Sequence, residues 1–235
     1  MAKKIDACLI CGAPLVYLPE TKPMECAGCG RTFPANAMCE NGHFICDDCH
    51  RAPALVVIRQ RCLESRETDP VLLAERLMQE SVVHMHGPEH HVLVGAALLT
   101  AFYNVTGREG LEGALEKMVQ RGKQVPGGTC GFFGCCGAAV SAGIFAAIVT
   151  ESTPLSEESW GKANALTGKC LQRIGTVGGP RCCKRDSYLS ILTAVQFCRE
   201  ELGVELPRPA RTICRFSHKC RECLEEKCPF YQKTE

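Results

Sequence analysis

Apolar residues recur at helical spacing through the middle of the chain, from residue 68 to residue 206. Glycines such as Gly107 and Gly122 interrupt the pattern, and Asp69-Pro70 is a typical helix start. We predict helices over about residues 70–80, 88–106, 108–121, 135–150, 153–174 and 184–202. Because no convincing period-two alternation occurs in this region, we expect an all-helical core.

One of these helices, at about 135–150, is rich in small side chains, namely Ala138, Ala139, Ser141, Ala142, Gly143, Ala146 and Ala147. The separation of packed helices depends on the size of the side chains between them. We therefore expect this helix to be central, with its neighbours packed tightly around it.

Cysteine-rich ends flank the helical region and divide the chain into three parts. We predict a zinc-binding module of zinc-ribbon or RING-like type over residues 1–52 and a helical core domain over 68–206. Residues 207–235 form a Cys-rich C-terminal segment, which we expect to pack on the core. The expected fold class is mainly α.

The 235-residue chain has 19 cysteines but a net charge of only +1, so no strong field attracts polyanions. Its first residues are charged and no apolar stretch follows them, so no signal peptide is expected. The most apolar run, residues 134–149, falls short of the roughly 20 residues that span a bilayer. We expect a cytoplasmic protein without a membrane segment, in which clustered cysteines are metal ligands or redox groups.

Three cysteines stand alone in the sequence: Cys62, Cys170 and Cys198. Free cysteine often packs as a small buried apolar residue. We assign these three to packing.

The N-terminal module has eight potential ligands in four pairs, which are Cys8, Cys11, Cys26, Cys29, Cys39, His43, Cys46 and Cys49. Eight ligands are enough for two tetrahedral zinc sites, and the pairing is open: sequential, crossed or nested. Residues 39–49 resemble the central half of a RING finger, which does not support ubiquitin-ligase function. Residues 1–50 carry a net charge of −2, which disfavours nucleic-acid binding and favours a structural or protein-docking role.

Four imidazoles and a carboxylate lie within the His loop, residues 84–91, which contains His84, His86, Glu89, His90 and His91. We expect at least one imidazole to bind a metal or to move protons, and Glu89 to orient an imidazole. Capping and core hydrogen bonding by neutral histidines is the alternative.

Two Gly-rich turns carry further thiols. The first, residues 125–136, holds Cys130, Cys135 and Cys136; the second, residues 178–186, holds Cys182 and Cys183 beside Arg181, Lys184 and Arg185. Both precede predicted helices, whose N-termini favour thiolates and anions. One thiol from each pair, with Cys130, would hold zinc or an iron–sulfur cluster; redox-active thiols and inert packing are the alternatives. Arg181 and Lys184 would stabilise thiolates or bind an anionic substrate.

The C-terminal segment contains Cys214, Cys220, Cys223 and Cys228. Four thiolates suit a tetrahedral zinc ion and a cubane iron–sulfur cluster equally well, and spacing alone does not choose between them.

The motifs of the His loop, both Gly-rich turns and the final Cys228-Pro-Phe resemble a domain-of-unknown-function family associated with anaerobic archaea and bacteria. This resemblance covers nearly the whole chain. Cys136-Gly-Ala and the small residues after it look like the C-GCAxxG-C-C proteins, which are described as redox or cluster-binding, over about one helix. The first resemblance also implies a radical-SAM or methyltransferase enzyme as a partner.

Together these features predict a metal-binding protein of anaerobic redox or one-carbon metabolism, with zinc and an iron–sulfur cluster as candidate cofactors. The candidate catalytic residues are Cys130, Cys182, His84, His86 and Glu89, in a cavity where both Gly-rich turns meet the His loop. The alternative is a non-catalytic, zinc-stabilised scaffold that docks a partner enzyme.

Overall fold

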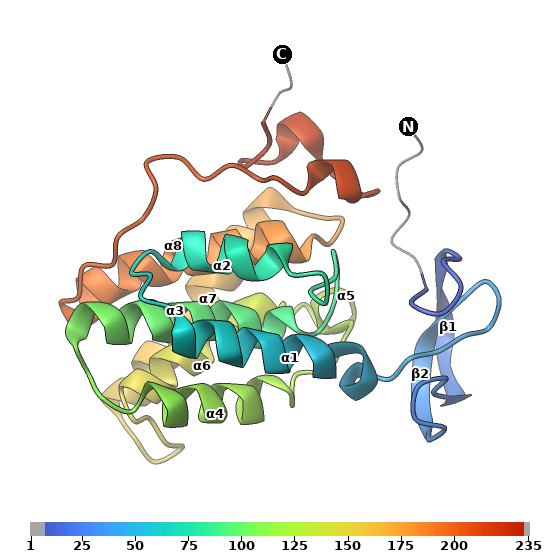
Figure 1. The fold of residues 1–235 in the computed structure, drawn as a ribbon, viewed down its shortest axis with the longest axis horizontal. Helices are drawn as coiled ribbons and strands as arrows, with labels where there is room; N and C mark the ends of the chain where they lie inside the picture. Colours follow the sequence, from blue (N-terminus) through green and yellow to red (C-terminus); the bar gives the residue numbers. More distant parts are fainter. Residues whose placement is uncertain (1–7, 233–235) are drawn as a thin grey trace.

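The computed structural model describes residues 8–232 and consists of a helical body with a small hairpin module on one side (Figure 1). The first six residues, on which the signal-peptide expectation draws, lie outside the described residues. The strands are β1 (Leu15–Glu25) and β2 (Thr32–Cys39), and the helices are α1 (Asp47–Glu64), α2 (Pro70–Gln79), α3 (His90–Thr106), α4 (Leu111–Gly122), α5 (Thr129–Phe132), α6 (Gly137–Val149), α7 (Glu158–Val177) and α8 (Cys183–Leu202).

The mainly helical fold and all six sequence-predicted helices are confirmed, as α2, α3, α4, α6, α7 and α8, with ends shifted by up to five residues. Asp69 caps α2 as expected, because its carboxylate accepts hydrogen bonds from the amides of Val71 and Leu72 at 2.8 and 3.1 Å. Two helices were not predicted. The short α5 lies in a Gly-rich turn, and α1 contains Pro53 and begins among metal-ligand cysteines, which hid it from a pattern-based prediction.

Helix α6 is central, as its small side chains suggested: α3, α4, α7 and α8 all pack against it. The approach of α3 is close enough that the Gly95 amide donates to Ser141 Oγ at 2.9 Å. Phe145 on α6 meets Phe102 on α3 with ring centroids 5.8 Å apart. Cys62, Cys170 and Cys198 are fully buried in the same core, which confirms their packing role.

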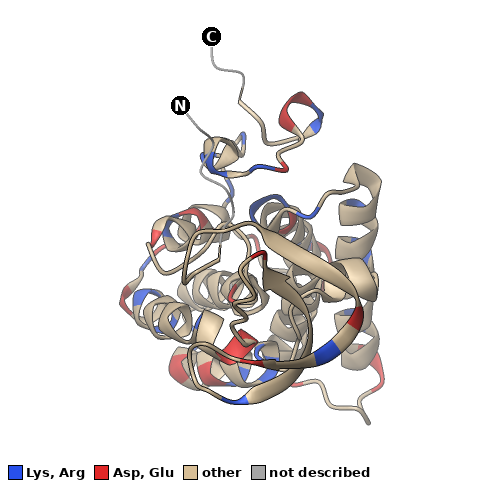
Figure 2. Cartoon of the chain, turned by 90° about the vertical axis from the view of Figure 1, so that its right-hand side faces the viewer, with Lys and Arg blue, Asp and Glu red and all other residues tan. Residues whose placement is uncertain are grey.

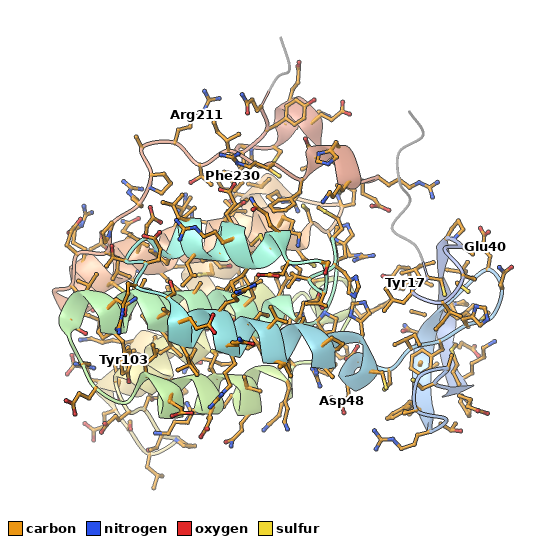
Figure 3. The ribbon with its side chains drawn as sticks, viewed as in Figure 1. Tyr17, Glu40, Asp48, Tyr103, Arg211 and Phe230 are labelled. Atoms are coloured by element: carbon orange, nitrogen blue, oxygen red, sulfur yellow. The ribbon has the colours of Figure 1, made fainter. Side chains whose placement is uncertain are left out.

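The N-terminal module is an antiparallel β1–β2 hairpin with an irregularity between Tyr17 and Lys22. Its buried apolar side chains are few and are mostly cysteines: Cys8, Met24, Cys26, Cys39 and Cys46. The interior of the module is therefore made of sulfur ligands rather than of aliphatic side chains. Figure 3 shows Tyr17 on the side of the hairpin that faces the helices.

The described part of the C-terminal segment, residues 207–232, crosses back over α8 and contains only two short 3-10 helices, η1 (Ser217–Lys219) and η2 (Glu225–Lys227). Phe230 anchors it: its ring lies 5.3 Å from that of Tyr188 on α8, and its carbonyl accepts from the Cys214 amide at 2.7 Å (Figure 3). Phe216 is buried as well. The segment thus packs on the core around two aromatic anchors.

Charges of both signs are interspersed on the side of the molecule that carries the module (Figure 2). Within residues 8–232, no helix combines the length and the apolar character needed to cross a membrane.

The close approach of α3 and α6 predicts opposite effects for two glycine substitutions. A Cβ at Gly95 would lie 2.9 Å from the carbonyl oxygen of Ser141, whereas a Cβ at Gly113 on α4 would meet nothing within 4 Å. Gly95→Ala is expected to destabilise the fold by about 2 kcal/mol through overpacking, and Gly113→Ala to stabilise it by about 0.5–1 kcal/mol through helix propensity. Urea unfolding of both variants measures this, and a neutral Gly95→Ala would contradict the assigned packing.

Candidate metal centres and the cleft beside them

The eight N-terminal candidate ligands form two groups with crossed pairing, each of which could hold a metal ion. Centre 1 brings together Cys8, Cys11, Cys39 and His43, and centre 2 brings together Cys26, Cys29, Cys46 and Cys49, in each case with one ligand atom per residue within 4.8 Å of the others. In centre 1 the Cys11 and Cys39 sulfur atoms are 3.8 Å apart, which matches the spacing of about 3.8 Å that a tetrahedral Zn–S distance of about 2.3 Å implies. The hairpin explains the crossing, because it places the first and third pairs at one end and the second and fourth at the other.

Hydrogen-bond donors lower the pKa of two of these thiols and so favour the thiolate form. Backbone and side-chain donors, led by the Ala13 amide, lower the pKa of Cys11 to about 6. At Cys26, burial opposes ionisation, but the amides of Cys46 and Gly28 outweigh it and lower the pKa to about 6. Because thiolates are the form that binds metals, both centres suit a thiophilic metal ion.

The first turn of α1 connects centre 2 to the helical core. It follows the ligand Cys46, and there Asp47 accepts a hydrogen bond from the Gly127 amide at 2.7 Å. His50, next to the ligand Cys49, lies with Nδ1 3.3 Å from the Glu89 carboxylate. A metal ion in centre 2 would therefore fix a helix turn that contacts both the first Gly-rich turn and the His loop.

Buried polar contacts hold the His loop in place. Glu89 is fully buried and accepts from the His84 amide at 2.9 Å. Burial raises the pKa of Glu89, but His50 and His90 outweigh it and lower the pKa to about 2, so the carboxylate is ionised. His84 also meets His50 edge-on, with ring centroids 4.8 Å apart. Glu89 therefore lies near an imidazole that the sequence did not single out, that of His50.

The two histidines at the start of α3 are both buried. His90 Nδ1 lies 3.1 Å from the Gly87 carbonyl and its Nε2 lies 3.2 Å from the Lys184 amine. His91 Nδ1 lies 3.0 Å from the Val125 carbonyl, so it ties the start of α3 to the first Gly-rich turn. Both are held by protein atoms.

Lys184, a candidate for substrate or thiolate binding, lies inside the protein with only 1% of its surface exposed. Its amine donates to the His84 carbonyl at 2.8 Å, and burial lowers its pKa to about 8. Its neighbour Arg185 is also buried and donates to Asp186 at 2.9 Å and to the Pro180 carbonyl at 3.0 Å.

A cleft of about 640 Å³ lies between the module and the helical core. The His loop and both Gly-rich turns line it with His84, His86, Cys130, Arg181 and Cys183. A second cavity, of about 500 Å³, shares Cys130 and Arg181 with the cleft and extends along α7. We call it the side pocket. The three loops that the sequence analysis placed around one cavity therefore do line one.

The vicinal cysteines of the two Gly-rich turns do not all line the same cavity. Cys136 lines the side pocket and lies 3.8 Å from the Asp186 carboxylate; burial, and then that carboxylate, raise its pKa. Cys183 lines the cleft, and burial raises its pKa to about 12. Cys135 lines neither cavity. Both half-buried thiols are therefore protonated at neutral pH unless a metal or another cation takes the place of the proton.

Cys182 and Cys130 line different pockets, although the two were expected to act together. Cys182 lines a separate pocket with the four cysteines of the C-terminal segment, Cys214, Cys220, Cys223 and Cys228. Next to this pocket, His86, Cys220 and Glu222 form a third group whose ligand atoms lie within 4.8 Å of one another.

Sequence reasoning missed His50, Asp186 and Glu222. His50 directly follows a metal ligand and Asp186 ends the second Gly-rich turn, so both positions carried a signal. Nothing local distinguished Glu222, because only the return of the chain over α8 brings it near His86.

Crossed pairing makes a direct prediction for metal stoichiometry. The double variant Cys8→Ser/Cys39→Ser removes two ligands from centre 1 and is expected to retain one N-terminal metal ion. Cys8→Ser/Cys26→Ser damages both centres and is expected to lose both ions. Elemental analysis of the purified full chain measures this, and the reverse order of losses would indicate sequential pairing.

The buried His90 predicts a pH dependence of stability. Burial lowers its pKa from 6.5 to about 3, with Lys184 adding to the effect. As pH falls below 6.5, the unfolded chain binds a proton that the folded chain does not, so unfolding free energy falls by about 1.4 kcal/mol per pH unit. His90→Gln, whose amide oxygen can still accept from Lys184, should reduce this slope between pH 6.5 and 5 in metal-saturated urea titrations. An unchanged slope would contradict the assignment.

Comparison with protein families places these features in a known group. A family model described as a family of unknown function, DUF5714, matches residues 58–231. The matched range contains the His loop, both Gly-rich turns and the C-terminal cysteines, but not the ligands of centres 1 and 2. No curated protein and no solved structure matches the chain. Because the match covers well over half of the 235 residues, and in agreement with the resemblance seen in the sequence, the chain belongs to the DUF5714 family of unknown function.

Proposed function

We propose that this chain is a metalloprotein of anaerobic redox or one-carbon metabolism, with zinc in centres 1 and 2 and the cleft as its working site. The observation that supports this most is the lining of the cleft, where thiols, imidazoles and a guanidinium from three separate loops meet. Clefts of this size that combine apolar walls with a few polar groups are the usual form of small-molecule sites.

Centres 1 and 2 would act structurally. The module buries almost nothing but its ligands, so metal binding is its source of folding energy. Through Asp47 and His50, centre 2 then holds the first Gly-rich turn and the His loop beside each other.

The residues that line the cleft would have different chemical roles. Cys130 and Cys183 would supply sulfur to a metal, an electron acceptor or a transferred group. Arg181, which lies 6.0 Å from the Tyr17 ring, would attract an anionic substrate. His86 is neutral, because burial and then the cations Arg181 and Lys184 lower its pKa to about 3. A neutral imidazole can accept or donate a hydrogen bond in the cleft without carrying charge.

The redox form of this proposal predicts that the cleft thiols change state reversibly. In anaerobic glutathione buffers of graded potential, Cys130 and Cys183 should show reversible loss of alkylation by mass spectrometry. Cys130→Ser should remove part of that change while leaving circular dichroism and melting temperature close to wild type. Cys170→Ser is the matched control, because Cys170 is fully buried in the core and lines neither cavity.

A scaffold function is the second candidate, and a specific surface favours it. Leu9, Ile10 and Leu15 are large apolar side chains on the module that are 42–51% exposed. Such side chains are typical of protein-docking surfaces. A radical-SAM or methyltransferase enzyme would be the partner. If the cleft thiols show no reversible change, while Leu9→Ser/Ile10→Ser weakens binding of such an enzyme, the scaffold function is favoured.

A further inference from the structure

Five cysteines from two distant parts of the chain converge beside the core. Cys182 immediately precedes α8, and the other four, Cys214, Cys220, Cys223 and Cys228, come from the C-terminal segment that returns over it. All five line one pocket, and the thiol of Cys182 is hydrogen-bonded to that of Cys220. The spacing of the four C-terminal cysteines could not reveal the fifth, because only the fold brings Cys182 to them.

The arrangement of these sulfur atoms differs from that in centres 1 and 2. There, all four ligand atoms lie within 4.8 Å of one another, as one ion requires. Over the described residues, no three of the five sulfur atoms in the C-terminal pocket meet that condition. The thiols converge, but as they stand no three of them have the spacing seen in centres 1 and 2. A cubane cluster holds its four thiolates further apart, because each thiolate binds a different iron atom.

Two buried basic residues lie in or near the wall of the pocket, and one of them, Arg185, is paired with Asp186. Arg185 lines the pocket and is 3% exposed, and the neighbouring Lys184 is buried with its amine 5.1 Å from the Phe216 ring. An oxidised 4Fe–4S cluster with four thiolates carries a net charge of about −2. Because Arg185 is paired with Asp186, the two basic side chains would offset part of the charge of such a cluster.

His86 contacts this site as a hydrogen-bond donor rather than as a ligand. Its Nδ1 accepts from the Cys183 amide at 3.5 Å, so this hydrogen-bond pattern assigns the proton of the neutral ring to Nε2. That Nε2 lies 3.8 Å from the Cys220 sulfur and 3.7 Å from the Glu222 carboxylate. A single ion held by His86, Cys220 and Glu222 would need the lone pair that this tautomer does not offer.

We propose that Cys214, Cys220, Cys223 and Cys228 hold a 4Fe–4S cluster, with Cys182 and His86 donating hydrogen bonds to the Cys220 sulfur. Assembly of the oxidised cluster takes two ferrous ions, two ferric ions and four sulfides, and the four thiols release their protons to solvent. The space between the thiols is about 10 Å³, so assembly moves the segment outward, which its irregular backbone between Phe216 and Phe230 permits.

The cluster lies beside the cleft. Met85 lines both the cleft and the cluster pocket, and His86 lines the cleft while its ring approaches Cys220. We assign to the cluster the transfer of two electrons, one at a time, from a low-potential one-electron donor to a disulfide formed by Cys130 or Cys183 in the cleft, which takes up two protons and becomes two thiols. This electron-transfer role rests on the proposed function, whereas the existence of the cluster does not.

The test is anaerobic reconstitution of the full chain with iron and sulfide in the presence of zinc. The expected product contains roughly four iron atoms and four sulfides per chain, has visible absorption that dithionite bleaches, and gives an EPR signal when reduced. Cys223→Ser and Cys228→Ser should lose most of the iron. Cys198→Ser, a buried thiol on α8 outside the pocket, is the matched control and should retain it.

His86 is a positioning residue, and its variants have their own readout. His86→Leu should keep the iron and sulfide but lower the midpoint potential, because hydrogen bonds to ligand sulfur stabilise the reduced cluster. His86→Gln, which restores a donor, should recover part of the shift. Cys182→Ser should likewise keep the cluster.

Four outcomes would overturn parts of this inference. A third zinc ion in place of iron and sulfide, or full iron retention in Cys223→Ser and Cys228→Ser, would reject the cluster at this site. Loss of the cluster in Cys182→Ser would reject the ligand assignment. A cluster that forms but never exchanges electrons with Cys130 or Cys183 would support the cluster and reject the proposed function of the cleft.

Discussion

The buried amine of Lys184 connects the second Gly-rich turn, the His loop and the C-terminal segment, which hold most of the candidate functional residues. From the first turn of α8 it donates to the His84 carbonyl, lies against His90 and approaches the ring of Phe216. A buried ammonium is costly unless it is well paired, so these contacts constrain the second Gly-rich turn, the His loop and the C-terminal segment to one arrangement. The cleft, the side pocket and the C-terminal thiol pocket all adjoin residues 181–186 because of this constraint.

Adjacent residues of the second Gly-rich turn line different cavities. Cys182 faces the C-terminal thiols, Cys183 faces the cleft, and Arg185 borders both the side pocket and the thiol pocket. A pair of neighbouring cysteines at the start of a helix naturally points in two directions. This gives a reason for vicinal cysteines that needs no bond between them: one sulfur belongs to the proposed cluster site and the other to the proposed reaction site.

Much of this architecture could be predicted from local pattern. Helix periodicity and caps such as Asp69-Pro70 located the core helices, and small residues marked α6 as central. The eight N-terminal candidate ligands were also recognisable, six from Cys-x2-Cys spacing and two from the Cys-x3-His pair Cys39 and His43. The features that local sequence pattern did not predict depend on contacts between residues that are distant in the sequence. The crossed arrangement depends on the β1–β2 hairpin, and α1 was hidden because ligand cysteines and Pro53 resemble a loop.

The grouping of the candidate site residues also depended on contacts between segments that are distant in the sequence. The sequence grouped Cys182 with Cys130, because both lie in Gly-rich turns, but tertiary contacts place Cys182 with Cys220. The roles of Lys184 and Glu89 depend on their burial, which cannot be predicted from the sequence of a polar loop. His50 became relevant only because α1 carries it to Glu89.

We infer that this protein has two mononuclear centres in its N-terminal module and one polynuclear iron centre where the C-terminal segment meets α8. Anomalous scattering at the zinc and iron edges, from crystals grown without oxygen, tests it most directly. The account predicts two zinc peaks in the module and iron density between Cys223 and Cys228, bordered by Arg185. Zinc alone at that position, or iron bound instead at Cys130 and Cys136, would contradict it.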